Sequence, residues 1–229
     1  MHKNIIIDAL KSHSRNDSKG IYWIDKKLEV EEFLSFKKLY ERSLSLANYL
    51  KNKGIKEQDP VILMYAPGLE FIVALMAIQF LGATPIPTYP PFSQSGFLRL
   101  LSIKSTLSIQ YALIDNPVSH LLLSQKIQNN KVVRLVMKMA KKNVSFSQDN
   151  FGELSELQFI NTSQLSLNPI SDHKFQEGQN SISVVQFTSG SISDPKGVVL
   201  THENILSNLH AIQTHFRVNA DSKILSWVP

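Results

Sequence analysis

The chain contains no cysteine. Disulfide frameworks, thiolate metal sites and cysteine nucleophiles are therefore excluded, and cysteine usage gives no information on the redox compartment. Charged residues are also few, at 19% of 229 residues, whereas hydrophobic residues reach 43%. Such a composition argues against intrinsic disorder. The length suits one sizeable α/β core, or slightly more than one.

Long uninterrupted hydrophobic runs are missing as well. The most apolar region, Val61 to Pro87, is broken by Pro67, Glu70 and Gly82. This pattern favours a buried strand, helix and strand over a membrane span. The apolar stretch at the N-terminus is too short for a signal peptide. We therefore expect no membrane span and a cytoplasmic location.

Positive charge is in modest excess, with a net charge of +5 and a pI near 9.3. The densest basic cluster, Lys126 to Lys142, interleaves its charges with valine, leucine and methionine. This interleaving is typical of the solvated face of an amphipathic segment, although a surface for nucleic acid or anionic lipid is the alternative. Because no nucleic-acid-binding motif is present, we expect no nucleic-acid partner.

Strand-like and helix-like patterns alternate along the chain. Ser35 is a suitable N-cap for a helix that closes just before Gly54. The alternation predicts an α/β fold with a mostly parallel sheet and helices on both faces. The expected strands are 21–24, 61–65, 84–87, 111–114 and 157–160, and the expected helices are 36–50, 69–81, 97–107 and a segment after Pro117.

The most informative segment is the run QFTSGSISDPKG at 186–197. A β-branched and aromatic run delivers the chain into a turn in which Gly190 can take a positive φ, so that successive N–H groups form a concavity for an anion. Lys196 supplies the positive charge that a polyphosphate needs. Hydroxyl donors are available from Thr188, Ser189, Ser191 and Ser193. The expected ligand is a nucleoside triphosphate.

This loop differs from the standard P-loop, because Gly197 follows the lysine and the next residues, 198–200, are typical of a second strand. The alternative interpretation is a Ser/Gly-rich hairpin turn with a solvated lysine. The combination of hydroxyl residues, Gly190 and Pro195-Lys196-Gly197 between two strands favours the phosphate-binding loop.

A helix is expected after the loop, capped by Thr201. The pair His202-Glu203 is not a zinc-protease motif, because the position of the second ligand is occupied by Leu206. We expect His202 at the helix start and His210 and His215 as partly exposed surface groups. A nucleophile elbow is absent from the sequence. No metal site is assigned.

The loop resembles the signature Thr-Ser-Gly-Ser-Thr-Gly-x-Pro-Lys-Gly of AMP-forming adenylating enzymes, the superfamily of acyl-CoA synthetases, peptide-synthetase adenylation domains and luciferases. Segments 34–39, 80–87 and 226–229 are similar to further family elements, in the family's order. Segment 66–71 and Tyr89-Pro90-Pro91 resemble the fatty acyl-AMP ligase branch. The loop departs from the signature at Ile192 and Ser193, which removes a hydroxyl and restricts the backbone.

The resemblance implies activation of a carboxylic acid, in this branch a fatty acid, by ATP with Mg²⁺. The products are an acyl adenylate and pyrophosphate, and an acyl carrier protein is the implied partner. Thr188, Ser189, Gly190 and Ser191 would hold the β- and γ-phosphates, and Lys196 would neutralise them. Ser193 and Gly197 complete the implied ATP-binding set. The alternatives are a fragment of an acyl-CoA synthetase and a truncated, non-catalytic remnant or interaction module.

The resemblance also implies a domain assignment. Residues 1–229 correspond to the N-terminal portion of an AMP-binding (adenylation) domain, and the rest of that domain and the C-terminal domain would follow Pro229. The catalytic residues are expected there. We therefore expect the segment to be inactive alone, and Ile192 and Ser193 to weaken turnover.

Overall fold

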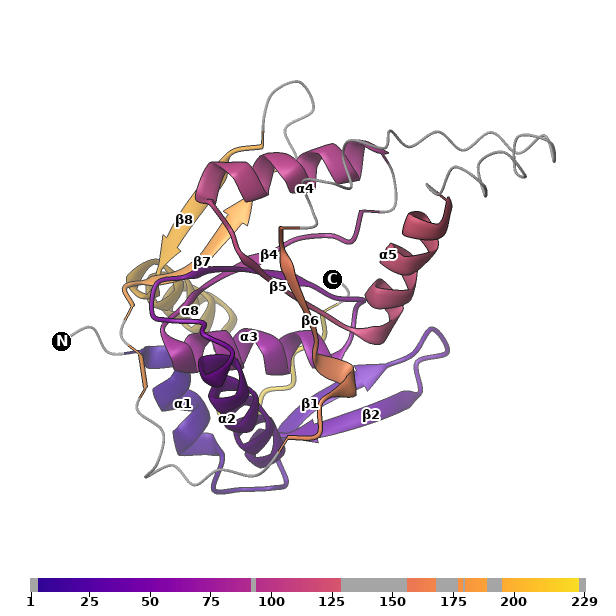
Figure 1. Ribbon diagram of the computed structural model, residues 1–229. Helices are drawn as coiled ribbons and strands as arrows, with labels where there is room; N and C mark the ends of the chain where they lie inside the picture. Colours follow the sequence, from indigo (N-terminus) through magenta and orange to yellow (C-terminus); the bar gives the residue numbers. More distant parts are fainter. Residues whose placement is uncertain are drawn as a thin grey trace.

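A parallel sheet lies at the centre of the chain in the computed structural model, which describes residues 4–91, 94–128, 156–167, 177–178, 180–188 and 195–226 (Figure 1). Four strands pair in the order β4-β3-β5-β6. From β3 the chain goes to β4 and then returns across β3 to β5, so the strand order reverses between β3 and β5. These strands are β3 (Pro60–Met64), β4 (Thr84–Pro87), β5 (Tyr111–Ile114) and β6 (Gln158–Asn161).

Helices cover both faces of this sheet, as the sequence predicts. Successive side chains of a strand point to opposite faces. Val61 and Leu63 of β3 accordingly pack with α1, α2 and α3, whereas Ile62 and Met64 pack with α4 and α5. The helices are α1 (Ile5–His13), α2 (Phe36–Asn52), α3 (Leu69–Leu81), α4 (Gln94–Leu107) and α5 (Asn116–Gln128).

The predicted helix boundaries are confirmed with small shifts. Ser35 caps α2, and its Oγ accepts the N–H of Lys38 at 3.2 Å. The helix continues to Asn52, slightly beyond its predicted end. Gly54 follows it with a φ of +99°. Residues with a side chain seldom adopt this backbone conformation, so steric hindrance favours glycine at this position.

Two antiparallel hairpins flank the central sheet. The first pairs β1 (Gly20–Ile24) with β2 (Val30–Ser35), and the second pairs β7 (Ile182–Phe187) with β8 (Gly197–Thr201). Strand β7 lies beside β4. Helix α8 (His202–Phe216) follows β8 and begins with a capping box, in which Thr201 Oγ1 accepts the N–H of Asn204 at 3.2 Å.

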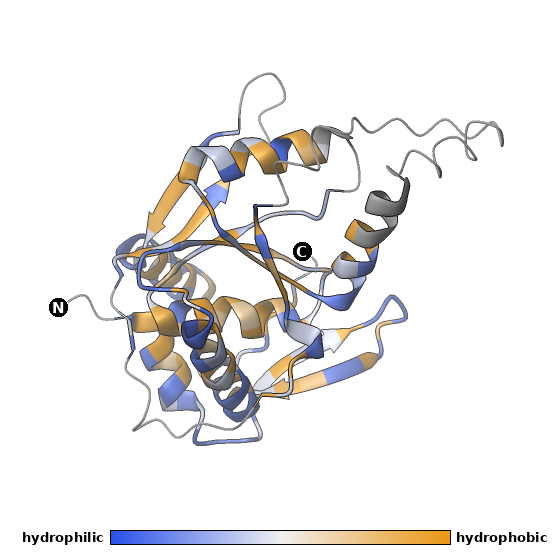
Figure 2. Cartoon of the chain, in the orientation of Figure 1, coloured by the Kyte–Doolittle hydropathy of each residue, from blue (hydrophilic) through white to orange (hydrophobic). Residues whose placement is uncertain are grey.

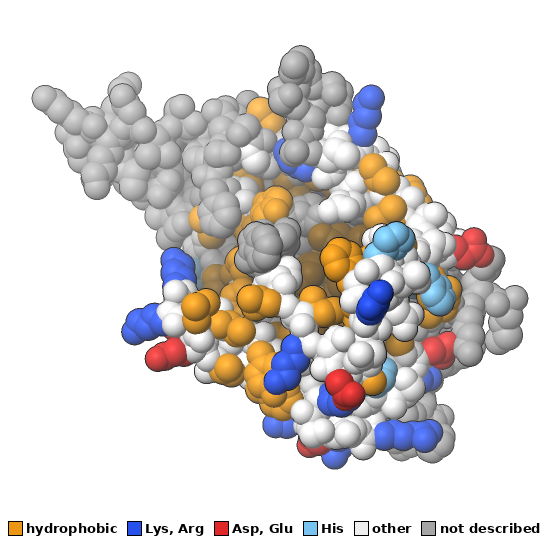
Figure 3. Space-filling model, turned by 180° about the vertical axis from the view of Figure 1, so that it is seen from behind, with side chains coloured by type: hydrophobic (Ala, Val, Ile, Leu, Met, Phe, Trp, Pro, Cys, Tyr) orange, Lys and Arg blue, Asp and Glu red, His pale blue; other side chains and the backbone are white. Residues whose placement is uncertain are grey.

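The face formed by β8 and α8 is apolar and uncovered. Figure 2 shows hydrophobic residues along β8. Val198 and Val199 point to opposite faces of this strand, yet both are exposed. On α8, Leu209 is 52% and Phe216 is 77% exposed. Figure 3 shows the molecule from behind, the side on which α8 lies, and hydrophobic side chains gather on this face as well. The apolar stripe of α8, which includes Leu209 and Phe216, is therefore not part of a core among the described residues.

Replacing Gly54 by alanine should destabilise the chain. The new Cβ would lie 3.2 Å from the hydroxyl oxygen of Tyr111, and the backbone would keep a conformation that alanine disfavours. We expect a loss of about 1–2 kcal/mol in thermal or urea unfolding. Asn52→Ala, on the exposed helix end nearby, is the control and should change stability by less than about 0.5 kcal/mol. Equal effects of the two substitutions would contradict the steric explanation.

Replacing Leu209 and Phe216 together by glutamine should lower the binding of a hydrophobic dye and the light scattering of the chain. Because both side chains are exposed, the melting temperature should change by only about 2–4 °C. Leu46→Gln in α2, at a position that is 2% exposed, is the comparison and should destabilise the chain by about 2–5 kcal/mol. A large loss of stability from the α8 double variant would show that its apolar stripe is already packed.

Candidate phosphate-binding site

The predicted phosphate-binding loop connects β7 to β8. Thr188 follows the last residue of β7 and is exposed, and Lys196 and Gly197 stand at the start of β8. Ser189, Gly190, Ser191 and Ser193 lie outside the described residues. The flanking strands and both ends of the loop therefore define the site.

A backbone hydrogen bond joins the two ends of the loop, Thr188 and Lys196, which together we call the neck. The N–H of Thr188 donates to the carbonyl of Lys196 at 3.0 Å. Directly below, Phe187 pairs with Gly197 in the antiparallel ladder. The two ends of the loop are thus held one strand spacing apart. The predicted tight turn itself, residues 189–194, lies outside the described residues.

The neck is anchored in the hydrophobic core on the α4 side of the sheet. Val185 and Phe187 are 5% and 7% exposed and pack in the cluster that contains Phe97 of α4. Gly197 lies against them, because a Cβ at this position would stand 3.1 Å from the Phe187 ring and 3.2 Å from Val185. A side chain at 197 would therefore push on this packing. The glycine predicted for the binding set has a structural role at the neck.

Lys196 has an exposed side chain. Its carbonyl is used in the neck, but none of the ion pairs found among the described residues involves its ammonium group. Among the described residues, this cation at the end of the loop therefore has no carboxylate partner. That position suits an anion held by the loop.

Arg99 of α4, which sequence reasoning missed, contacts the same neck. Its Nη2 donates to the carbonyl of Phe187 at 3.0 Å and to the carbonyl of Thr188 at 3.1 Å. No local pattern marks this arginine, because its partners are 88 and 89 residues away in the sequence. A second cationic residue is thus fixed beside the loop.

A second group of polar side chains lies at the carboxyl ends of β3, β5 and β6. Asp115 is buried and accepts the N–H groups of Ala66 at 2.8 Å and Val118 at 2.9 Å. The Tyr65 hydroxyl contacts Thr162 Oγ1 at 2.9 Å. Burial raises the pKa of the Tyr65 phenol well above its ordinary value, so this hydroxyl stays neutral. These contacts join the strand ends to one another and to the start of α5.

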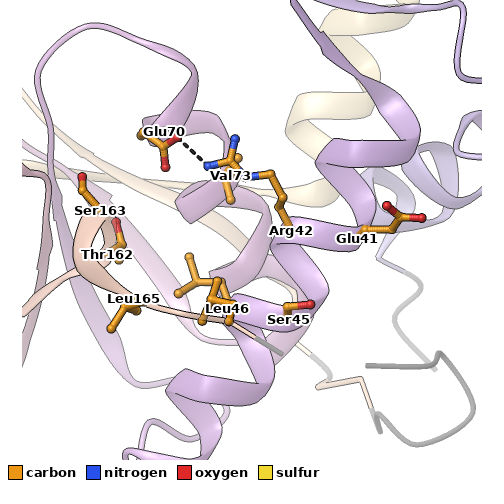
Figure 4. Close-up of a pocket in the computed structure, with 10 residues that line it drawn as sticks. Glu41, Arg42, Ser45, Leu46, Glu70, Val73, Thr162, Ser163 and Leu165 are labelled. Carbon is orange, nitrogen blue, oxygen red and sulfur yellow. Dashed lines mark hydrogen bonds and ion pairs between the residues drawn. The ribbon is translucent and has the colours of Figure 1, made fainter. Parts of the chain in front are cut away.

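A cavity of about 740 Å³ lies between α2, α3 and the 3₁₀ turn η1 (Thr162–Gln164) (Figure 4). Arg42 and Glu70 form an ion pair of 2.5 Å at its edge and neutralise each other. The sheet separates this cavity from the phosphate-binding loop, because α2 and α3 cover one face while the neck packs with α4 on the other. The remaining lining residues are Glu41, Ser45, Leu46, Val73, Thr162, Ser163, Leu165 and Leu167.

Within the described ranges, no group of three His, Cys, Asp or Glu side chains is arranged to hold a metal ion. In the same part of the chain, no helix has the length and apolar character to cross a membrane.

The AMP-binding enzyme family matches residues 17–229. The chain belongs to this family, in agreement with the parallel sheet and the loop between β7 and β8. The resemblance inferred from the sequence and the predicted fold class are thereby confirmed.

Among curated proteins, the chain is 25% identical over 229 residues to a medium-chain-fatty-acid–[acyl-carrier-protein] ligase of Moorena producens, covering 98% of this chain and 35% of that protein. It is 29% identical to a ligase of the same description from Teredinibacter turnerae, covering 86% of this chain and 33% of that protein. The chain therefore spans about a third of the length of these relatives.

Solved structures show the same likeness. A fatty acid AMP ligase from Legionella pneumophila superimposes with a TM-score of 0.69 at 26% identity, over 100% of this chain and 35% of that chain. The fold of this chain is thus that of the N-terminal part of adenylate-forming enzymes.

The helix that follows the loop begins with a buried histidine. His202 is the first residue of α8 and is 6% exposed, whereas His210 and His215 are exposed as predicted. Neither ring nitrogen of His202 has a hydrogen-bond partner within the described residues. Burial lowers the pKa of this imidazole below 6.5. At neutral pH the folded chain therefore holds His202 uncharged.

Acidification should destabilise the chain through His202. Below pH 6.5 the unfolded chain binds a proton at this position while the folded chain does not, so stability falls as the pH drops toward the lowered pKa. The contribution is at most about 1.4 kcal/mol per pH unit. His202→Gln should remove this part of the pH dependence in urea unfolding between pH 7 and 5. His210→Gln, at an exposed position, should retain the original profile, and an unchanged profile for His202→Gln would refute the assignment.

Proposed function

We propose that residues 1–229 form the N-terminal portion of an adenylation domain and supply the phosphate-binding loop of a carboxylate-activating ligase. The observation that carries the proposal is the neck, where the ends of a hydroxyl-rich loop are tied together by the 3.0 Å hydrogen bond between Thr188 and Lys196. The exposed ammonium of Lys196 and the guanidinium of Arg99 stand beside it. Membership of the AMP-binding family supports ATP as the ligand.

The proposed chemistry is attack of a carboxylate oxygen on the α-phosphorus of ATP. A new carbon–oxygen–phosphorus link forms as the bond from the α-phosphorus to the bridging oxygen breaks, and pyrophosphate leaves with that electron pair. Catalysis of this kind depends on positioning and on stabilising the charge that develops on the leaving group. In our proposal Lys196 neutralises the β- and γ-phosphates, and donors from Thr188, Ser189, Gly190, Ser191 and Ser193 hold them.

In our proposal Mg²⁺ binds together with the triphosphate of ATP. Magnesium commonly keeps several waters and is held largely by substrate phosphates. The loop sequence offers hydroxyl groups, and Lys196 and Arg99 are cations; such groups suit phosphate oxygens better than a bare metal ion. When bound, the ion would offset negative charge on the triphosphate. The residues of this chain would contact the phosphates and hold them in place.

A fatty acid is the carboxylate that we propose as substrate, with an acyl carrier protein as acceptor. Support comes from the two curated ligases, whose descriptions name medium-chain fatty acids and the acyl carrier protein. Because residues 1–229 correspond to about a third of these relatives, we propose that complete turnover also depends on the parts that match the remaining two thirds. The segment alone would then bind nucleotide without completing the reaction.

The choice of acceptor separates a carrier-protein ligase from an acyl-CoA synthetase. In a protein that contains the complete domain, the adenylate should be consumed when acyl carrier protein is supplied and should persist when CoA is supplied. The reverse result would favour the CoA ligase. The third alternative, a non-catalytic remnant, predicts no fatty-acid-dependent exchange of pyrophosphate into ATP by that protein.

Lys196→Ala should weaken the binding of MgATP, measured by calorimetry on the chain. Loss of a charge-assisted contact to phosphate costs about 1.5–3 kcal/mol, which corresponds to a roughly 10- to 100-fold rise in Kd. Lys223→Ala, at another exposed lysine, controls for the loss of one positive charge and should change Kd by less than about 3-fold. If both variants bind like the original chain, Lys196 does not contact the phosphates.

A further inference from the structure

We propose that Arg99 is a positioning residue that sets the direction in which the phosphate-binding loop leaves β7. This inference rests on the proposed function of the loop and deepens it. It adds a residue from α4, a part of the sequence far from the loop motif, to the machinery that holds the nucleotide. Arg99 acts on the loop backbone and does not itself need to contact the phosphates.

The geometry at the end of β7 carries the inference. In an extended strand, consecutive carbonyl groups point in opposite directions. Here the consecutive carbonyls of Phe187 and Thr188 both accept from one nitrogen of Arg99, at 3.0 and 3.1 Å. The backbone must therefore turn between them. Arg99 holds the residue at which the strand becomes the loop.

Thr188 is consequently fixed from two directions. Its N–H donates to the carbonyl of Lys196, just before β8, and its own carbonyl accepts from Arg99 on α4. The conformation of the first loop residue is thus defined before any ligand binds. A binding loop whose first residue is already held in place loses less conformational entropy when a ligand binds. Removing Arg99 should therefore lower affinity for a polyphosphate without removing any contact to it.

The position of Arg99 on a rigid helix makes this hold effective. Phe97 and Leu100, its neighbours on α4, are 0% and 2% exposed and belong to the same core cluster as Phe187. The helix and the strand end therefore share one packed environment, which fixes the distance between them. The planar guanidinium offers two N–H groups on Nη2, one for each carbonyl. Lysine could reach the carbonyls only with a flexible point charge.

Amide hydrogen exchange of the unliganded chain tests the hold on the loop. In Arg99→Met, peptides covering 184–200 should exchange about 10-fold faster or more, while peptides from α3 should be unchanged. Arg99→Lys should recover part of the protection. Arg42→Met is the matched control, because it removes a half-exposed arginine from an ion pair on the opposite face and should leave the loop unchanged. Unchanged loop exchange in Arg99→Met, or equal acceleration in α3, would overturn the inference.

Calorimetry on the same variants tests whether the contact of Arg99 with the loop backbone affects the binding of polyphosphates. Arg99→Met should raise the Kd for MgATP and for pyrophosphate about 10-fold, and Arg42→Met should not. Faster loop exchange with unchanged affinity would overturn the positioning role. If neither the original chain nor Arg42→Met binds MgATP or pyrophosphate, the proposed function fails. That failure is distinguishable, because the exchange experiment still reports whether Arg99 holds the loop.

Discussion

The hydrogen bond between the backbone of Thr188 and that of Lys196 is the constraint on which the site depends. It closes the loop at the point where β7 and β8 part, and the lysine whose carbonyl it engages has an exposed side chain. Packing of Phe187 against Gly197 supports the bond from below. A turn closed in this way can present amides and hydroxyls to an anion without a helix behind it, in contrast to a P-loop.

The central sheet divides the molecule into two environments. On the α4 side, a core that includes Val185 and Phe187 holds the neck and leaves two cations beside it. On the other side, α2 and α3 enclose a cavity whose charged residues, Arg42 and Glu70, compensate each other. We therefore propose the α4 side, beside Lys196 and Arg99, as the place of an anionic ligand rather than the cavity.

The exposure of the apolar face of β8 and α8 affects the stability of the chain. Side chains such as Leu209 and Phe216, 52% and 77% exposed, contribute little to stability while water covers them. Exposed apolar patches of this kind commonly mark surfaces against which further protein packs. The relatives are about three times as long as this chain. The stability of the chain rests on the cores that flank the central sheet.

The sequence by itself determined the fold class and most element boundaries, because these depend on local periodicity, caps and residue types within a few positions of one another. Ser35 and Thr201, which cap their helices as predicted, show this. Only the tertiary structure decided which residues meet across the chain. Arg99 reaches Phe187 over 88 residues, His202 is buried at its helix start, and α2 and α3 enclose a cavity with η1. Contacts of this range follow from the packing of whole elements, which no local pattern encodes.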